Sequence, residues 1–234
     1  MGGEAVLIKG FLEVSLLDWP GRMASVVFLP GCNFRCPFCH NPGLVLSPEE
    51  LEDFPVKEVL AAIGARAGWI DGVVITGGEP TVSAGIMHLL HVFKRRGIPV
   101  KLDTNGSRPE ILREILEKNL ISAAAMDIKA PLVEDAYSAA AGVKADIAAI
   151  KESITLLSRS GIELFFRATM VPGLHDAAAV REMASAVPER LTLQGFRPAD
   201  RLVDLSFGGI KPFTEEQFRL LQDTADNVCR ERLA

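Results

Sequence analysis

The stretch Leu29-Pro-Gly-Cys32-Asn-Phe-Arg-Cys36-Pro-Phe-Cys39-His-Asn-Pro42 organises the rest of the chain. It holds three of the protein's four cysteines, with three and then two residues between them. Thiolates this close in sequence can converge on one metal centre only if the backbone curls around that centre. Gly31, Pro37 and Pro42 are residues that favour turns. The stretch therefore predicts a loop wrapped around a metal.

The number and softness of the ligands narrow the choice of metal. Thiolate sulfur suits zinc, copper(I) and iron–sulfur clusters. Structural zinc usually takes four protein ligands, and this chain has no second Cys-x-x-Cys pair. A four-iron cluster is usually held by four cysteines, so three would leave one iron open to bind another molecule. A zinc site completed by Cys229 or His40 is the alternative. Three ordinary buried cysteines are disfavoured, because the stretch is rich in Gly, Pro, Asn and Arg.

Composition and charge bound the class of protein. The 234 residues are 48% hydrophobic and 24% charged, an ordinary globular mixture. A net charge of -5 argues against a large basic face, so we expect no nucleic-acid partner. The first residues do not resemble a signal peptide, and no apolar run approaches the ~18 residues of a membrane-spanning helix. With no disulfide framework, these features predict a cytoplasmic, reduced and, for an exposed iron–sulfur site, anaerobic setting.

Short apolar runs alternate with helical patterns along the chain. After an extended segment over 6–16, strands are expected at 24–29, 72–76, 98–103, 121–127, 162–169 and 190–196. A helix start is expected at 47–50, and helices at 56–67, 82–96, 108–119, 133–140, 145–160, 176–186 and 214–232. Such alternation implies parallel pairing through right-handed crossovers, and six units are too few for a closed eight-unit barrel. The prediction is an α/β fold, a partial (β/α)6 barrel of parallel strands in a single domain over residues 1–234. A flavodoxin-like sheet is the competitor.

Polar residues gather where the predicted strands end. They are Glu79, Asp103, Thr104, Asp127, Lys129, Arg167 and Thr169. In a parallel barrel these strand ends share the face where ligands bind, so we expect one site over the cysteine loop. Gly77-Gly78-Glu79-Pro80 contributes two glycines that let the backbone approach a ligand, and a carboxylate that can accept hydrogen bonds from an ammonium group. Each segment alone also reads as an ordinary turn or solvated strand end.

The spacing Cys32-x3-Cys36-x2-Cys39, with aromatic Phe38 before the last cysteine, resembles the signature of the radical SAM superfamily. Segments 15–21 and 31–42 together resemble a narrower branch, the glycyl-radical-enzyme activases. Within it they are most similar to the activating proteins of anaerobic ribonucleoside-triphosphate reductase, with pyruvate formate-lyase activating enzyme as near kin. The resemblance implies a [4Fe–4S] cluster on the three cysteines whose unique iron binds S-adenosylmethionine. Reductive cleavage of that molecule yields a 5′-deoxyadenosyl radical that abstracts hydrogen.

The resemblance also implies roles for the polar residues. Residues 77–80 resemble the family's GGEP motif, which with Phe38 contacts the cofactor. Asp127-Ile-Lys129 resembles the Asp-x-Lys element, with Asp127 near the ribose of S-adenosylmethionine and Lys129 near its carboxylate. The pair Asp103-Thr104 resembles the place where pyruvate formate-lyase activase binds a monovalent cation.

The later strands carry the remaining implied contacts. Arg167 and Thr169 match positions that reach S-adenosylmethionine or the peptide, whereas His175 reads as a helix-start residue. Gln194-Gly-Phe-Arg197-Pro departs from the histidine-containing segment of the formate-lyase activase. This departure favours the ribonucleotide-reductase branch and leaves the adenine contacts unassigned.

The expected function follows from the resemblance. It is an activase that takes hydrogen from a glycine α-carbon of a partner enzyme, with anaerobic ribonucleoside-triphosphate reductase as the expected partner. A flavodoxin or ferredoxin is the expected electron donor, and no side chain is expected to act as a general acid or base. Three alternatives stay open: activation of pyruvate formate-lyase or another glycyl-radical enzyme, radical SAM chemistry on a small molecule, and a zinc-stabilised binding protein without enzymatic activity.

Overall fold

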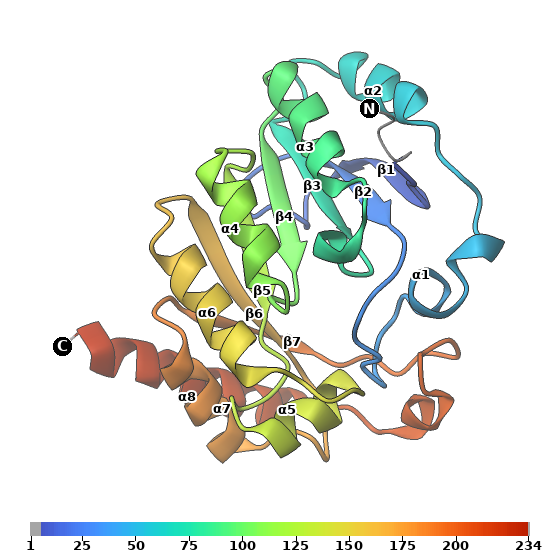
Figure 1. The fold of residues 1–234 in the computed structure, drawn as a ribbon. Helices are drawn as coiled ribbons and strands as arrows, with labels where there is room; N and C mark the ends of the chain where they lie inside the picture. The colour runs from blue at the N-terminus through green and yellow to red at the C-terminus, as the bar shows by residue number, and fades with distance from the viewer. Residues whose placement is uncertain (1–5, 234) are drawn as a thin grey trace. The chain divides into compact units, whose positions relative to one another are not determined.

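The structure is a computed structural model that describes residues 6–233. Seven strands follow one another across an open sheet in chain order (Figure 1). They are β1 (Gly10–Ser15), β2 (Ala24–Leu29), β3 (Gly72–Gly77), β4 (Val100–Thr104), β5 (Ala123–Asp127), β6 (Glu163–Met170) and β7 (Leu191–Gly195). The β1–β2 pair is antiparallel, while the β2–β3, β3–β4 and β6–β7 pairs are parallel. The order never reverses, as it would in a flavodoxin-like sheet, and the predicted partial-barrel α/β fold is confirmed.

Helices connect the parallel strands. They are α1 (Pro42–Leu46), α2 (Val56–Gly64), α3 (Ile86–Arg95), α4 (Pro109–Glu117), α5 (Glu134–Ala141), α6 (Ile147–Ser158), α7 (Ala177–Ala186) and α8 (Glu215–Leu233). The predicted helix start at 47–50 is wrong, because Pro48–Glu50 forms one 3-10 turn and Ser47 makes no capping hydrogen bond. Pro55 disfavours helical backbone at the residue before it, so α2 begins only at Val56. Helix α1 and the 3-10 turn Leu205–Gly209 were not predicted.

The described chain divides into two compact units, each assembled from separate stretches of sequence. The first unit comprises residues 6–33, 43–104 and 110–124, and the second comprises 34–42, 105–109 and 125–233. We describe each unit by itself. The single domain expected over residues 1–234 stays a prediction.

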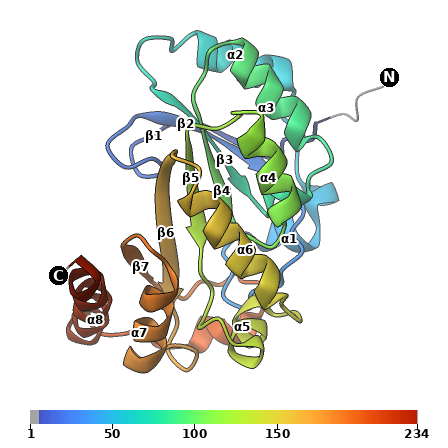
Figure 2. The same cartoon turned by 60° about the vertical axis from the view of Figure 1, so that its left-hand side comes forward.

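The core of the first unit lies between its strands and the helices that cover them. Figures 1 and 2 show α3 and α4 running along one face of the sheet beside β3 and β4. Strand β3 is a continuous apolar run whose Val73, Val74 and Ile75 are fully buried, as expected for a parallel strand covered on both faces. Trp19, also fully buried, lies against Gly72 at the start of β3. This packing fixes the start of β3, the strand whose other end carries the glycine motif.

In the second unit, α7 and α8 lie beside each other and α8 lies beside β7 (Figure 2). Along β6, Phe166, Ala168 and Met170 are buried in alternation with more exposed residues. Strand β5 has low β propensity, yet Ala123 to Met126 are fully buried, so burial outweighs propensity there. No helix among residues 6–233 is both long enough and apolar enough to cross a membrane.

Candidate functional site

In the first unit, the glycine motif after β3 is joined to the start of the cysteine loop. The Gly78 amide donates to the Leu29 carbonyl at 2.9 Å, and the Glu79 amide donates to the Gly31 carbonyl at 2.7 Å. A β-carbon at position 78 would overlap the Gly31 carbonyl oxygen. Glycine is therefore needed at position 78 for the two backbone segments to approach each other.

The carboxylate of Glu79 is buried and held by three donors. One of its oxygens, Oε1, accepts from the Thr81 amide at 3.1 Å, the Thr81 hydroxyl at 2.5 Å and the Thr104 hydroxyl at 2.8 Å. Only 1% of Glu79 is exposed to solvent. Thr104 ends β4, so these bonds join the ends of two neighbouring parallel strands. They fix Glu79 in one orientation, as a binding carboxylate requires.

The other residue of the predicted cation site, Asp103, already has a cationic partner. The ammonium of Lys101, two residues earlier on β4, forms an ion pair with an Asp103 carboxylate oxygen. Both side chains are buried, and Lys101 is almost entirely so. A buried lysine on a strand is rare unless it is paired. Sequence inspection did not single out Lys101, although a charged residue inside an apolar strand is the signal that could have found it.

In the second unit, α5 supports one side of the cysteine loop. The Arg35 amide donates to the Ala141 carbonyl at 2.8 Å, and the ring of Phe34 meets Tyr137 edge-on with centroids 6.4 Å apart. The next residue, Gly142, has φ of +68°, and a β-carbon there would overlap the Arg35 carbonyl. The loop therefore lies directly on the C-terminal end of α5.

The segment after β7 holds the same loop at two further backbone positions. The Val203 amide donates to the Cys39 carbonyl at 3.2 Å, and the Asp204 amide donates to the Pro37 carbonyl at 3.0 Å. The Arg197 carbonyl oxygen accepts a hydrogen bond from His40 Nε2 at 2.7 Å. Sequence reasoning missed both supports, because neither is local in sequence.

The thiols of Cys36 and Cys39 lie in this loop, where the Cys39 amide donates to the Cys36 carbonyl at 3.0 Å. Burial raises the pKa of the Cys36 thiol, and the cation of Lys129 opposes that shift. Cys32 belongs to the first unit, and Cys229 lies in α8. Within residues 6–233, no three His, Cys, Asp or Glu side chains are arranged to hold a single metal ion. The three-cysteine metal site stays a prediction.

Asp127, at the end of β5, forms a half-buried ion network with two cations. Arg167 Nε lies 3.1 Å from one carboxylate oxygen, and Lys129 Nζ lies 3.4 Å from the other. Burial alone would raise the pKa of Asp127, but Arg167 and then Lys129 override it and bring the pKa to about 2. Burial would likewise lower the pKa of Lys129, but Asp127 and then Cys36 raise it above its ordinary value. The sequence predicted these three residues at strand ends, and the structure brings them together.

His175 binds the backbone of Lys129, one member of this ion network. Its Nδ1 accepts from the Val171 amide at 3.0 Å, and its Nε2 donates to the Lys129 carbonyl at 2.8 Å. The ring is buried, and burial lowers the pKa of His175. His175 therefore fixes the backbone of Lys129 as a neutral imidazole. Sequence reasoning assigned it only to a helix start.

One cavity, in the second unit, is lined in part by a predicted site residue, and another, in the first unit, lies at the start of the cysteine loop. In the second unit, a cavity of about 500 Å³ is lined by His40, Thr169, Gln194, Gly195 and Arg197. It brings Thr169 of β6 to the segment whose sequence departs from the formate-lyase activase.

The predicted cofactor contact Phe38 is buried, with 5% of the residue exposed to solvent.

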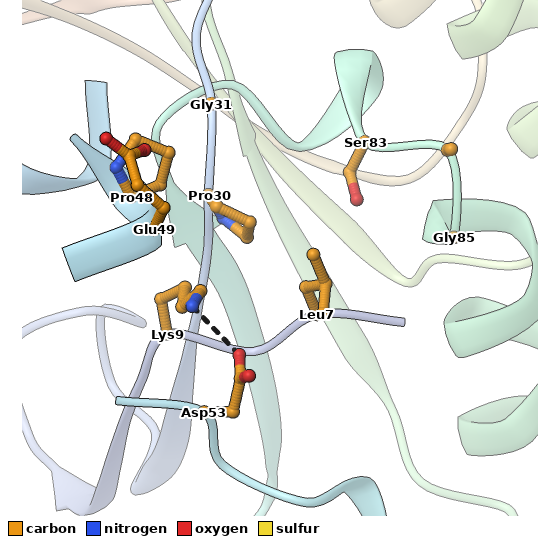
Figure 3. Close-up of a pocket in the computed structure, with 10 residues that line it drawn as sticks. Leu7, Lys9, Pro30, Gly31, Pro48, Glu49, Asp53, Ser83 and Gly85 are labelled. Atoms are coloured by element: carbon orange, nitrogen blue, oxygen red, sulfur yellow. Dashed lines mark ion pairs between the residues drawn. The ribbon is translucent and has the colours of Figure 1, made fainter. Parts of the chain in front are cut away.

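In the first unit, a cavity of about 550 Å³ lies beside Pro30 and Gly31 (Figure 3). Lys9 Nζ crosses it to Asp53 at 2.9 Å and also donates to the Leu51 carbonyl at 2.8 Å. These two charges satisfy each other, and the remaining lining is mainly apolar.

Comparison with known proteins shows which family the chain belongs to. The model of the radical SAM superfamily matches residues 26–185. A Methanocaldococcus jannaschii protein, provisionally named as a glycyl-radical enzyme activating enzyme, is 30% identical over 232 residues, which cover 96% of this chain and 89% of that protein. The pyruvate formate-lyase-activating enzyme of Clostridium pasteurianum is 29% identical over 191 residues, covering 77% of this chain and 75% of that enzyme.

Solved structures share the fold. Streptococcus suis SuiB bound to S-adenosylmethionine superposes with a TM-score of 0.63 at 19% identity, covering 88% of this chain. The chain spans 44% of SuiB, less than half of its length. Archaeal TYW1 gives a TM-score of 0.58 at 16% identity, covering 87% of this chain and 71% of TYW1.

Proposed function

Because the chain belongs to the radical SAM superfamily and is an activating enzyme of glycyl-radical enzymes, we propose a cofactor set and a protein substrate for it. The cofactors are a [4Fe–4S] cluster on Cys32, Cys36 and Cys39, and S-adenosylmethionine beside it. The protein substrate is anaerobic ribonucleoside-triphosphate reductase. The observation that carries the proposal is the cysteine loop held against the ion network of Asp127, Lys129 and Arg167.

The donor set around Cys36 fits a cluster. A buried thiolate is costly unless positive charge and hydrogen-bond donors compensate it. Lys129 supplies the positive charge, since it interacts electrostatically with both Cys36 and Cys39. No group among the described residues accepts the proton of the buried Tyr137 hydroxyl, so this hydroxyl is available to donate a hydrogen bond to a cluster. Each thiolate of a cluster binds a different iron, so the sulfurs of a cluster need not meet at one point as zinc ligands do.

When bound, the cluster supplies the electron for reductive cleavage of the sulfonium C–S bond. The residues of this chain bind and orient S-adenosylmethionine. The glycine turn packs against the backbone at Gly31 and so places Glu79, which would accept from the ammonium. Lys129 offsets the carboxylate of S-adenosylmethionine, and Asp127 accepts from the ribose hydroxyls.

Phe38, Arg167 and Thr169 complete the proposed contacts. The cavity beside Thr169 has the polar lining that an adenosyl group needs, with Gln194 and Arg197 as donors. These two residues stand where the formate-lyase activase has its histidine-containing segment. That difference is the observation that favours the reductase as partner.

We also propose a monovalent cation at Asp103 and Thr104. Oxygen ligands suit such an ion. Lys101 already neutralises Asp103, however, and Thr104 donates its hydroxyl to Glu79. A bound cation would have to compete with Lys101 for the carboxylate.

The second candidate substrate is pyruvate formate-lyase, which the Clostridium pasteurianum relative favours by its name. We propose a flavodoxin or ferredoxin-type protein as electron donor for either substrate. In both cases the product is a stored glycyl radical on the partner.

The test is anaerobic reconstitution, reduction and mixing with S-adenosylmethionine and each candidate partner. Electron paramagnetic resonance should show the glycyl doublet with the reductase and not with pyruvate formate-lyase. A doublet with pyruvate formate-lyase alone would move the assignment to the second candidate. Iron and sulfide analysis separates both from a zinc protein, in which tight zinc and no cluster absorbance would be found.

A pair of cysteine variants checks the ligand assignment. Cys36→Ala should abolish cleavage of S-adenosylmethionine, because the loop then lacks a cluster ligand. Cys229→Ala, in α8, should leave cleavage unchanged. Cleavage retained by Cys36→Ala would contradict the assignment.

A further inference from the structure

Tyr137 carries a buried hydroxyl whose proton has no acceptor in the described part of the chain. The residue lies in α5 of the second unit and is fully buried; the Lys129 amide approaches its phenol oxygen, but no group among the described residues accepts its proton. A buried hydroxyl left unpaired costs about 1–3 kcal/mol relative to a paired one. Such a group in a folded protein calls for an explanation, and one explanation is a bound group that completes its hydrogen bonding.

The surroundings of Tyr137 show which group that would be. Its ring meets Phe34 edge-on, and Phe34 precedes Cys36 by two residues in the cysteine loop. The loop is fixed to the same helix by the bond from Arg35 to Ala141. Tyr137 also interacts electrostatically with Lys129 and Cys36. The hydroxyl therefore lies among the residues proposed to hold the cluster.

The chemistry of the hydroxyl suits a donor rather than an acid. Burial raises the pKa of Tyr137, so the phenol keeps its proton at every working pH. The acceptors that a cluster would bring to this place are sulfur atoms, the Cys36 thiolate and the bridging sulfides. Hydrogen bonds to these sulfurs are among the factors that set the reduction potential of a cluster.

We propose that the Tyr137 hydroxyl donates a hydrogen bond to a sulfur of the cluster held at Cys36. This inference rests on the cluster assignment made under the proposed function. Tyr137 is then a positioning and tuning residue. Its hydrogen bond stabilises the reduced cluster, in which the sulfurs carry more negative charge. In the cluster-free protein the same hydroxyl lacks this acceptor, which lowers the stability of the fold.

The test compares Tyr137→Phe with wild type in two states, without S-adenosylmethionine. In the cluster-free protein the variant should melt within about one degree of wild type, because the hydroxyl proton that it loses had no acceptor and the Lys129 amide makes only a weak contact with the phenol oxygen. In the reconstituted protein its potential, measured by redox titration, should be more negative. A two- to tenfold lower equilibrium constant for reduction is expected, and tenfold corresponds to about 59 mV for one electron.

Ser153→Ala is the matched control in the same unit. The Ser153 hydroxyl is also fully buried, but it donates to the Gly106 carbonyl at 2.6 Å. Its removal should lower the melting temperature of the cluster-free protein and leave the potential unchanged. The two variants thus give opposite patterns if Tyr137 acts on the cluster.

Three results would overturn the inference, and they are distinguishable. If wild-type protein binds iron and sulfide but Tyr137→Phe leaves the potential unchanged, the hydrogen bond to sulfur does not exist and the cluster assignment stands. If the wild-type protein takes up no cluster under reconstitution, the proposed function fails and this inference fails with it. A lower melting temperature for cluster-free Tyr137→Phe would show a structural partner instead, such as a buried water.

Discussion

At residue 78 the backbone leaves no room for a methyl group. The amide of the following residue, Glu79, donates to the carbonyl of Gly31, the residue just before Cys32. A β-carbon on residue 78 would overlap that same carbonyl oxygen, which is a backbone atom and cannot rotate away. The glycine motif is thus explained by packing within the first unit, before any ligand is considered.

We predict that Gly78→Ala destabilises the protein by about 1–3 kcal/mol, the usual range for overpacking. Chemical denaturation of the cluster-free protein measures this. Gly64→Ala at the end of α2 is the control, since no atom lies within 4 Å of its β-carbon and its φ is not positive. That substitution should leave stability unchanged or raise it slightly. Equal effects of the two changes would remove the steric explanation.

His175 makes stability depend on pH through a single buried ring. Its folded-state pKa is lowered from the ordinary 6.5, whereas the unfolded chain keeps the ordinary value. The unfolded state therefore binds the proton more readily, and stability falls as pH drops below about 6.5 toward the folded-state pKa. The loss is complete once the pH is below both values.

Replacement of His175 tests this dependence. His175→Ala should lose about 1–3 kcal/mol at pH 8, because the Val171 amide and the Lys129 carbonyl lose their partner. Its stability should then change less than that of wild type between pH 7 and pH 5. Urea denaturation across this range measures both, and parallel pH profiles would exclude His175 as the source.

At the scale of elements, α5 and the segment 197–204 act as two supports for the cysteine loop. Three of their bonds to the loop join backbone to backbone and so depend on where the elements end. A fourth comes from the ring of His40, which donates to the Arg197 carbonyl. Helix α5 ends in the left-handed residue Gly142, which makes the close approach to Arg35. Contacts within the protein therefore contribute to the shape of the loop.

Two glycines of the second unit isolate the contribution of this contact. Gly142 and Gly161 both have positive φ, +68° and +74°, but only the first faces a neighbouring atom, the Arg35 carbonyl. We expect both alanine variants to lose stability from backbone strain. Gly142→Ala should in addition lose most of its iron on reconstitution and gel filtration. Equal iron content in the two variants would show that α5 does not shape the loop.

At the scale of the whole molecule, the chain passes repeatedly between its two compact units. The first unit ends at Asn33 within the cysteine loop and resumes at Gly43, so the loop itself belongs partly to each. Neither unit is a continuous stretch that could be synthesised alone. This interleaving supports the expectation of a single cooperative domain.

Two optical probes test that expectation. Both tryptophans, Trp19 and Trp69, lie in the first unit, whereas the helices that dominate far-ultraviolet circular dichroism occur in both units. If the units unfold together, the urea midpoints from tryptophan fluorescence and circular dichroism should coincide. Separate midpoints would mean two independently unfolding units and would contradict the single-domain prediction.

The sequence alone located the strands and marked the loop as the candidate site. Strands such as 24–29 and 72–76 could be found because fully buried parallel strands are short apolar runs between turn residues. The cysteine spacing and the polar residues at strand ends marked the site, since parallel strands bring their carboxyl ends together. The ion network of Asp127 with Lys129 and Arg167 is of this kind.

Only the tertiary structure decided what surrounds these residues. The pairing of Lys101 with Asp103, the support of Lys129 by His175 and the Tyr137 hydroxyl without an acceptor among the described residues join or isolate groups by their three-dimensional position. The hydrogen bond of His175 to Lys129 joins residues 46 positions apart, and such a contact has no periodicity and leaves no pattern in the chain. The sequence therefore identifies the residues expected to carry the chemistry. Packing determines which of them already have hydrogen-bond or ionic partners within the protein.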